Sequence, residues 1–189
     1  QMPSQDIERT FYLIGDAGKS PKNDLSTGLK KFKKHISKKS SKKDYALFLG
    51  ENIYPSGLPK KDDEGRSDAE NHLNAQIKAV EGFKGKTIFL PGNHDWYSNG
   101  IKGVKRQEKY IEKALGKNTF KPENGCHLES ISIGKNIQLI IVDTQWYLED
   151  WDKNPTINDN CEIKTRARFF DELEGVLKKA QGKRVVFAM

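Results

Sequence analysis

Three places in the chain combine a glycine with an oxygen-bearing side chain directly after an apolar run. The pairs are Gly15-Asp16, Gly50-Glu51 and Gly92-Asn93, and His94 follows the last of them. Each pair alone is an ordinary turn signal, but side chains that follow successive strands of an α/β sheet converge at one edge. Crowded carboxylates repel one another unless a cation offsets their charge, and oxygen donors beside an imidazole suit iron, manganese or zinc. The repeated pattern therefore predicts a metal site.

Apolar runs alternate with amphipathic stretches along the chain, which indicates strands alternating with helices. The runs before the three glycine pairs are expected to be strands. This alternation predicts a layered α/β domain with mixed sheets over residues 1–189. The expected elements are strands Phe11–Ile14, Tyr45–Leu49 and 87–90, a helix through Leu25, Leu29, Phe32 and Ile36, helices 68–83 and Ile101–Leu115, a hairpin of 127–133 with Ile137–Val142, a helix 164–180 with Phe169, Phe170, Leu173 and Leu177 on its apolar stripe, and a buried strand 185–189.

The three glycine segments resemble the first three sequence blocks of the calcineurin-like metallophosphoesterases. Gly18 and Tyr54 resemble the purple acid phosphatase branch, because most other branches have a histidine at the position of Gly18 and this branch takes a tyrosine ligand from the second block. The resemblance implies a metallophosphoesterase-type α/β sandwich that hydrolyses phosphate esters, foremost phosphomonoesters, with two divalent or trivalent ions of iron, zinc or manganese. The blocks read Gly15-Asp16-Ala17-Gly18, Gly50-Glu51-Asn52-Ile53-Tyr54 and Gly92-Asn93-His94-Asp95.

The resemblance also implies a ligand set. Asp16 and Tyr54 would bind one metal ion, Asn93 would bind the other, and the carboxylate of Glu51 would bridge the pair. Two such cations hold phosphoryl oxygens, generate a hydroxide near neutral pH and stabilise an in-line transition state. The substrate expected at this site is a small phosphorylated molecule.

Two neighbouring residues would act without binding metal. By the same resemblance, His94 faces the substrate phosphate and protonates or stabilises the leaving oxygen. Asp95 would orient the His94 ring, accept hydrogen bonds from neighbouring backbone, or cap the following turn.

The chain departs from the family pattern at two points. The second block normally has aspartate where this chain has Glu51, and the added methylene puts a bridged metal pair and full activity in doubt. The family also draws histidines from two later blocks, whereas His35, His72 and His127 lie in no such block. We therefore expect a longer protein whose remaining strands and histidines follow Met189, and weak or no activity from residues 1–189 alone. A non-catalytic binding domain on the same fold is the alternative, as is a phosphodiesterase that acts on nucleotides.

The charge distribution bears on the choice of partner. The 189 residues carry a net charge of +7, and Lys30 to Lys43 include eight lysines and no arginine. Nucleic-acid readers usually add arginines and aromatic residues, so a solvated helix face is favoured over an anion-attracting patch, and nucleic acid is the less favoured partner. No apolar run approaches the roughly 20 residues that span a bilayer, so no transmembrane segment is expected in this chain.

The two cysteines, Cys126 and Cys161, are too few and too far apart for a zinc knuckle. They are either a disulfide pair or two buried thiols, depending on the compartment. The branch that the chain resembles is commonly exported, which implies an extracellular or periplasmic protein whose two cysteines are bonded or close together.

Overall fold

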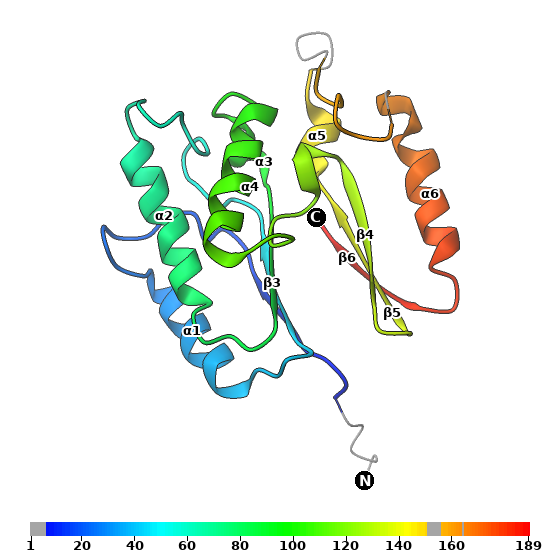
Figure 1. Cartoon of the computed structure of the whole chain (residues 1–189), viewed down its shortest axis with the longest axis horizontal. Coiled ribbons are helices and arrows are strands. Elements are labelled where there is room, and N and C mark those ends of the chain that lie inside the picture. Colours follow the sequence, from blue (N-terminus) through cyan, green and yellow to red (C-terminus); the bar gives the residue numbers. More distant parts are fainter. Residues whose placement is uncertain (1–6, 151–155, 164) are drawn as a thin grey trace.

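A computed structural model of the chain describes residues 7–150, 156–163 and 165–189. Its first sheet has three parallel strands in the order β1-β2-β3, with helices against its outer face (Figure 1). Because parallel strands point the same way, the loops that carry the three glycine pairs leave the sheet at one edge. The elements of this half are β1 (Phe11–Ile14), α1 (Thr27–Lys39), β2 (Tyr45–Leu49), α2 (Arg66–Ala79), β3 (Lys86–Leu90), α3 (Asn93–Trp96) and α4 (Ile101–Leu115).

The second sheet has the order β4-β5-β6. Its first two strands are antiparallel and are joined at Gly134, whereas β6 runs parallel to β5. Helix α6 lies against the outer face of this sheet (Figure 1). The elements of this half are η1 (Glu123–Gly125), β4 (Leu128–Ile133), β5 (Ile137–Val142), α5 (Thr144–Leu148), η2 (Arg166–Arg168), α6 (Phe169–Lys179) and β6 (Arg184–Ala188).

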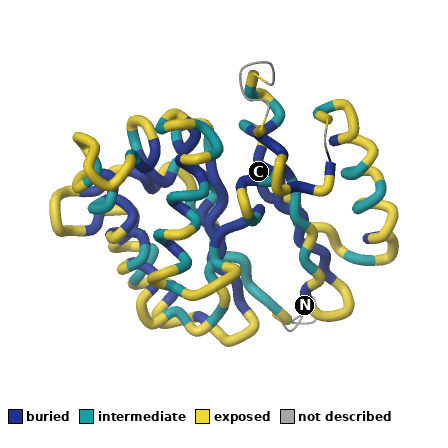
Figure 2. The backbone as a smooth tube through the Cα atoms, turned by 45° about the horizontal axis from the view of Figure 1, so that its top comes forward, coloured by how far each residue is buried: buried dark blue, intermediate teal, exposed yellow. Residues whose placement is uncertain are grey.

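The core lies in two layers on either side of the first sheet. Between the sheets, Leu47 and Leu90 belong to one apolar cluster with Leu139 and Ile141. On the helical side, the rings of Phe48 and Phe89 stack with centroids 4.1 Å apart, and Leu29, Ile36, Leu73 and Ile111 of the helices are buried in the same cluster. The buried segments run through the middle of both halves (Figure 2). The structure is a sandwich of two sheets between helices, which confirms the predicted fold class.

The second sheet is mixed, as expected, whereas the strands of the first sheet are all parallel. Helical crossovers between its strands impose that direction. The helix expected over 68–83 instead runs from Arg66 to Ala79. It ends early because Val80 already leaves the helical conformation and Gly82 has a left-handed φ of 81°. The lysines of α1 lie on its outer side, with Leu29 and Ile36 buried against the sheet.

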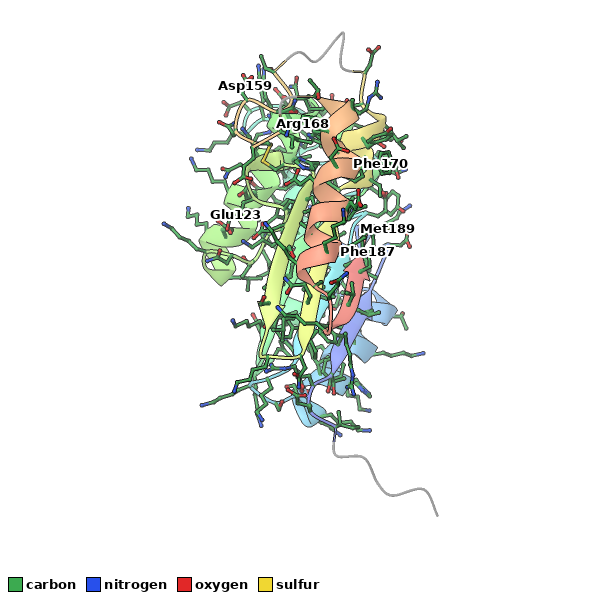
Figure 3. The ribbon with its side chains drawn as sticks, turned by 90° about the vertical axis from the view of Figure 1, so that its right-hand side faces the viewer. Glu123, Asp159, Arg168, Phe170, Phe187 and Met189 are labelled. Atoms are coloured by element: carbon green, nitrogen blue, oxygen red, sulfur yellow. A yellow bond between two sulfur atoms is a disulfide. The ribbon has the colours of Figure 1, made fainter. Side chains whose placement is uncertain are left out.

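The largest correction concerns the end of the chain. The helix expected from residue 164 begins as an α-helix only at Phe169, and 58% of Phe170 and 42% of Leu177 are exposed. The strand expected to be buried leaves 44% of Phe187 exposed. The reason is that α6 packs through Phe169 against the cluster that contains Ile140 of β5, which leaves the outer side of β6 uncovered. Figure 3 shows Phe170, Phe187 and Met189 along this side.

A disulfide bond links two distant segments of the chain. Cys126, just before β4, forms a disulfide with Cys161, and their Cα atoms lie 5.5 Å apart. The bond ties the second sheet to the segment 156–163.

Among the described residues, no helix has the length and apolar character needed to cross a bilayer.

Candidate metal centre

The three loops that follow β1, β2 and β3 touch through their backbones. A Cβ atom added at Gly18 would lie 2.6 Å from the amide nitrogen of Ile53, and one added at Gly92 would lie 2.6 Å from the amide nitrogen of Glu51. Neither distance is sterically allowed, so only glycine fits at these positions. The second loop is therefore packed between the first and the third, and all three carry predicted site residues to one place.

The carboxylates of the first two loops sit on strained backbone. Asp16 has a φ of 53° and Glu51 a φ of 56°, both in the left-handed region. This conformation costs a residue other than glycine about 1–2 kcal/mol, and such strain gathers at functional sites. The strained geometry turns the chain sharply at the ends of β1 and β2, which lie at the same edge of the parallel sheet.

Tyr54 links the two carboxylates. Its hydroxyl donates to Oδ1 of Asp16 over 2.7 Å. This hydrogen bond, the burial of the phenol and the charge of Glu51 raise the pKa of Tyr54 well above its ordinary value. The phenol therefore keeps its proton unless a cation at this place offsets the negative charge of its neighbours.

The ring of His94 is held on several sides. Its centroid lies 4.7 Å from that of Tyr54 and 4.8 Å from that of Tyr97. Its Nδ1 pairs with the carbonyl oxygen of Pro55 at 2.5 Å, and because a carbonyl only accepts, Nδ1 carries the proton. Nε2 is turned towards the second loop, 3.9 Å from Oε2 of Glu51.

Asn93 lies at the start of α3, next to His94 in the third loop. Its Nδ2 donates to the hydroxyl of Tyr97 over 2.6 Å. The structure thus connects Asp16, Tyr54, Glu51 and His94 by direct contacts or close charges, whereas the described contact of the Asn93 side chain is with Tyr97.

Asp95 is completely buried and joins the second loop to the third. Its carboxylate accepts from the backbone nitrogens of Gly92 at 2.8 Å and of Asn52 and Ile53 at 3.1 Å. Burial, helped by the charge of Glu51, raises the pKa of Asp95 to about 6, although these hydrogen bonds lower it. Of the roles expected for Asp95, the contacts are those of a backbone acceptor.

Asp143 is a buried acid at this edge that we did not single out from the sequence. It follows β5 and accepts from Nε1 of Trp96 at 2.9 Å and from the backbone nitrogen of Trp146 at 3.2 Å. Burial raises its pKa to about 8. The signal was an acid directly after the apolar run of Ile137–Val142, but it lacks the glycine that marks the other three positions.

A family model described as calcineurin-like phosphoesterase matches residues 9–189. The chain belongs to this family. The match spans both sheets and all three site loops, and the calcineurin-like phosphoesterases are hydrolases that cleave phosphate esters with metal ions, typically divalent. Comparison with curated proteins gives no significant match.

The residues of this calcineurin-like phosphoesterase fit the oxygen-donor part of a metal site. Oε2 of Glu51 is buried without a hydrogen-bond partner, although Nε2 of His94 lies 3.9 Å away. A buried carboxylate oxygen without a partner is costly, and a cation would satisfy it. The carboxylate, phenol and amide oxygens of these loops suit hard and borderline cations.

The nitrogen donors are placed differently. His35 packs against Tyr12, His72 accepts at Nδ1 from the backbone of Ser20, and His127 pairs with Glu172. Only His94 belongs to the three loops. Within residues 7–150, 156–163 and 165–189, no group of three or more His, Cys, Asp or Glu side chains is arranged to hold a metal ion.

Proposed function

We propose that this phosphoesterase hydrolyses small phosphomonoesters at two metal ions held by the loops after β1, β2 and β3, as in the purple acid phosphatase branch. The observation that carries the proposal is the buried Oε2 of Glu51, which has no hydrogen-bond partner beside the Asp16–Tyr54 pair and the Nε2 of His94. A cation at this place would offset the cost of burying this oxygen without a partner.

In this proposal Asp16 and Tyr54 bind one ion, Asn93 binds the other, and Glu51 is shared between them. The ions, iron, zinc or manganese, would supply a hydroxide near neutral pH and offset the charge of the phosphate. A cation held by Asp16 and Tyr54 would take the place of the hydrogen bond between them and favour the deprotonated phenol, whose proton would pass to solvent. The hydrogen bond from Tyr54 holds the Asp16 carboxylate in place without a ligand.

His94 acts on the leaving group. The Pro55 carbonyl holds the proton on Nδ1, so Nε2 is the atom that gains a proton and passes it to the leaving oxygen. The rings of Tyr54 and Tyr97 keep the imidazole in place while it does so.

The test compares Glu51→Gln with wild-type protein of full length. After loading with iron, zinc or manganese, we expect the wild type to retain metal through dialysis and to hydrolyse p-nitrophenyl phosphate. Glu51→Gln keeps the size of the side chain and removes its charge, so metal retention and turnover should fall by about 100-fold or more, beyond the loss typical of residues around the ligands. Glu174→Gln removes an equivalent charge on exposed α6 and should match the wild type.

Further variants and substrates separate the competing hypotheses. Higher turnover in Glu51→Asp would show that the longer side chain misplaces the bridging carboxylate. Faster hydrolysis of bis(p-nitrophenyl) phosphate than of the monoester would overturn the phosphomonoester assignment. A wild-type protein that neither retains metal nor hydrolyses either ester would contradict the proposal and support a non-catalytic binding domain.

A further inference from the structure

The carboxamide of Asn93 is a metal ligand only when it is turned the right way. It has one oxygen, which accepts or ligates, and one NH2 group, which only donates. Rotating the amide by a half-turn would present the NH2 group to a cation and abolish binding. A ligand of this type needs a neighbour that engages the nitrogen and leaves the oxygen free.

Tyr97 provides that neighbour. Asn93 Nδ2 donates to the Tyr97 hydroxyl over 2.6 Å, so in this structure the nitrogen is occupied and Oδ1 remains available. A hydroxyl can donate as well as accept, but only its accepting role leaves Oδ1 free, so this hydrogen bond and a cation at Oδ1 favour the same orientation of the amide. Tyr97 follows Asn93 by one helical turn, and its backbone nitrogen donates to the carbonyl of His94 at the end of α3, which fixes its position. The side chain is 55% exposed, so burial does not explain its orientation.

The same side chain also holds His94. The Tyr97 ring lies 4.8 Å from the imidazole, and Tyr54 contacts the imidazole at 4.7 Å. We infer that Tyr97 is a positioning residue, which presents Oδ1 of Asn93 to a metal ion through its hydroxyl and steadies His94 through its ring. This inference rests on the proposed function, because it needs Asn93 as a metal ligand.

The first test separates the hydroxyl from the ring. Tyr97→Phe keeps the ring and removes the acceptor of the Nδ2 hydrogen bond. We expect the metal dissociation constant, measured by titration with Mn²⁺ or Zn²⁺ without substrate, to rise by about 10-fold or more, as is typical when a partner of a metal ligand is lost. The melting temperature of the metal-free protein should stay unchanged.

Tyr110→Phe is the matched control. The Tyr110 hydroxyl donates to Oδ1 of Asn74 over 2.9 Å, so this variant also breaks a tyrosine–asparagine hydrogen bond, but between α4 and α2. Its metal affinity should equal that of the wild type. A comparable loss of affinity in both variants would overturn the inference.

A second arm tests whether Tyr97 acts through Asn93. In Asn93→Asp the two carboxylate oxygens are equivalent, so a half-turn of the side chain no longer matters. Adding Tyr97→Phe to this background should weaken metal binding much less than it does in the wild type, which a double-mutant cycle measures. An equal loss in both backgrounds would show that Tyr97 merely supports the loop and would contradict the inference.

The outcomes separate a failure of this inference from a failure of the proposed function. If the wild type binds no metal, the proposed function fails first. If the wild type binds metal and hydrolyses phosphomonoesters while Tyr97→Phe stays within twofold of its affinity, the proposed function stands and the inference about Tyr97 is wrong.

Discussion

The site loops of the first sheet and the outer side of β6 in the second sheet differ in which groups they bury. At the loops, Asp95 and Asn52 are buried although they are polar, and backbone and side-chain groups satisfy Asp95. In the second half, Phe187 on β6 and Phe170 on α6 are exposed although they are apolar (Figure 3). One region keeps costly polar groups from water, and the other leaves apolar groups open to it.

This difference shows what holds each region together. The loops are fixed by close backbone approach and by hydrogen bonds that tolerate little change, whereas β6 is held through its inner face and its pairing with β5. An exposed apolar edge strand also offers unpaired backbone groups to other strands. Substitutions should therefore have contrasting effects in the two regions.

The largest contrast is expected between two phenylalanines on outer faces of the two sheets. Phe48 on β2 is fully buried beneath the helices, whereas Phe187 on β6 is 44% exposed. Phe48→Ala should lower the free energy of unfolding by about 3–5 kcal/mol because it leaves a cavity, and Phe187→Ala should change it by less than about 1 kcal/mol. Urea denaturation measures both, and equal losses would show that the side of β6 is covered in solution.

An effect that depends on pH is expected at Asp143, which follows β5 and accepts a hydrogen bond from Trp96 of α3. Its folded pKa of about 8 lies above the ordinary value of 3.8. Between pH 4 and 8 the folded state thus holds a proton that the unfolded state has released, so this group lowers stability as pH rises, by up to about 1.4 kcal/mol per pH unit. Asp143→Asn has no such titration, so its stability relative to wild type should increase over this range and level off above pH 8. A constant difference from pH 4 to 8 would contradict the raised pKa.

The smallest effects, of opposite sign, are expected from one chemical change in two places. Gly18→Ala forces a Cβ against the backbone of the second loop and should destabilise the protein by about 1–3 kcal/mol. Gly175→Ala adds a Cβ in open space on α6 and should stabilise it by about 0.5–1 kcal/mol. Thermal unfolding distinguishes the two, and a neutral Gly18→Ala would mean that the loops are not packed this closely.

The fold class and the three site loops could be predicted because their signals lie in neighbouring residues of the sequence. The alternation of apolar runs and helices gave the fold class, and the three glycine pairs marked the loops that meet. The start of the last helix and the burial of its apolar stripe were predicted less well, because the stripe of Phe169, Phe170 and Leu177 suggests burial whether or not anything covers it. The metal ligands, the export of the protein and the histidines expected after Met189 stay predictions.

The sequence by itself determined which residues stand at strand ends, since an apolar run followed by glycine is a property of neighbouring residues. Only the tertiary structure decided that Tyr54 bonds to Asp16, that Tyr97 engages Asn93 and His94, and that Asp143 is buried against Trp96. The contacts of Tyr97 join residues three and four positions apart, and they depend on side-chain direction, which residue type alone does not fix. The contacts of Tyr54 and Asp143 join residues 38 and 47 positions apart, and they arise only when separate segments pack together.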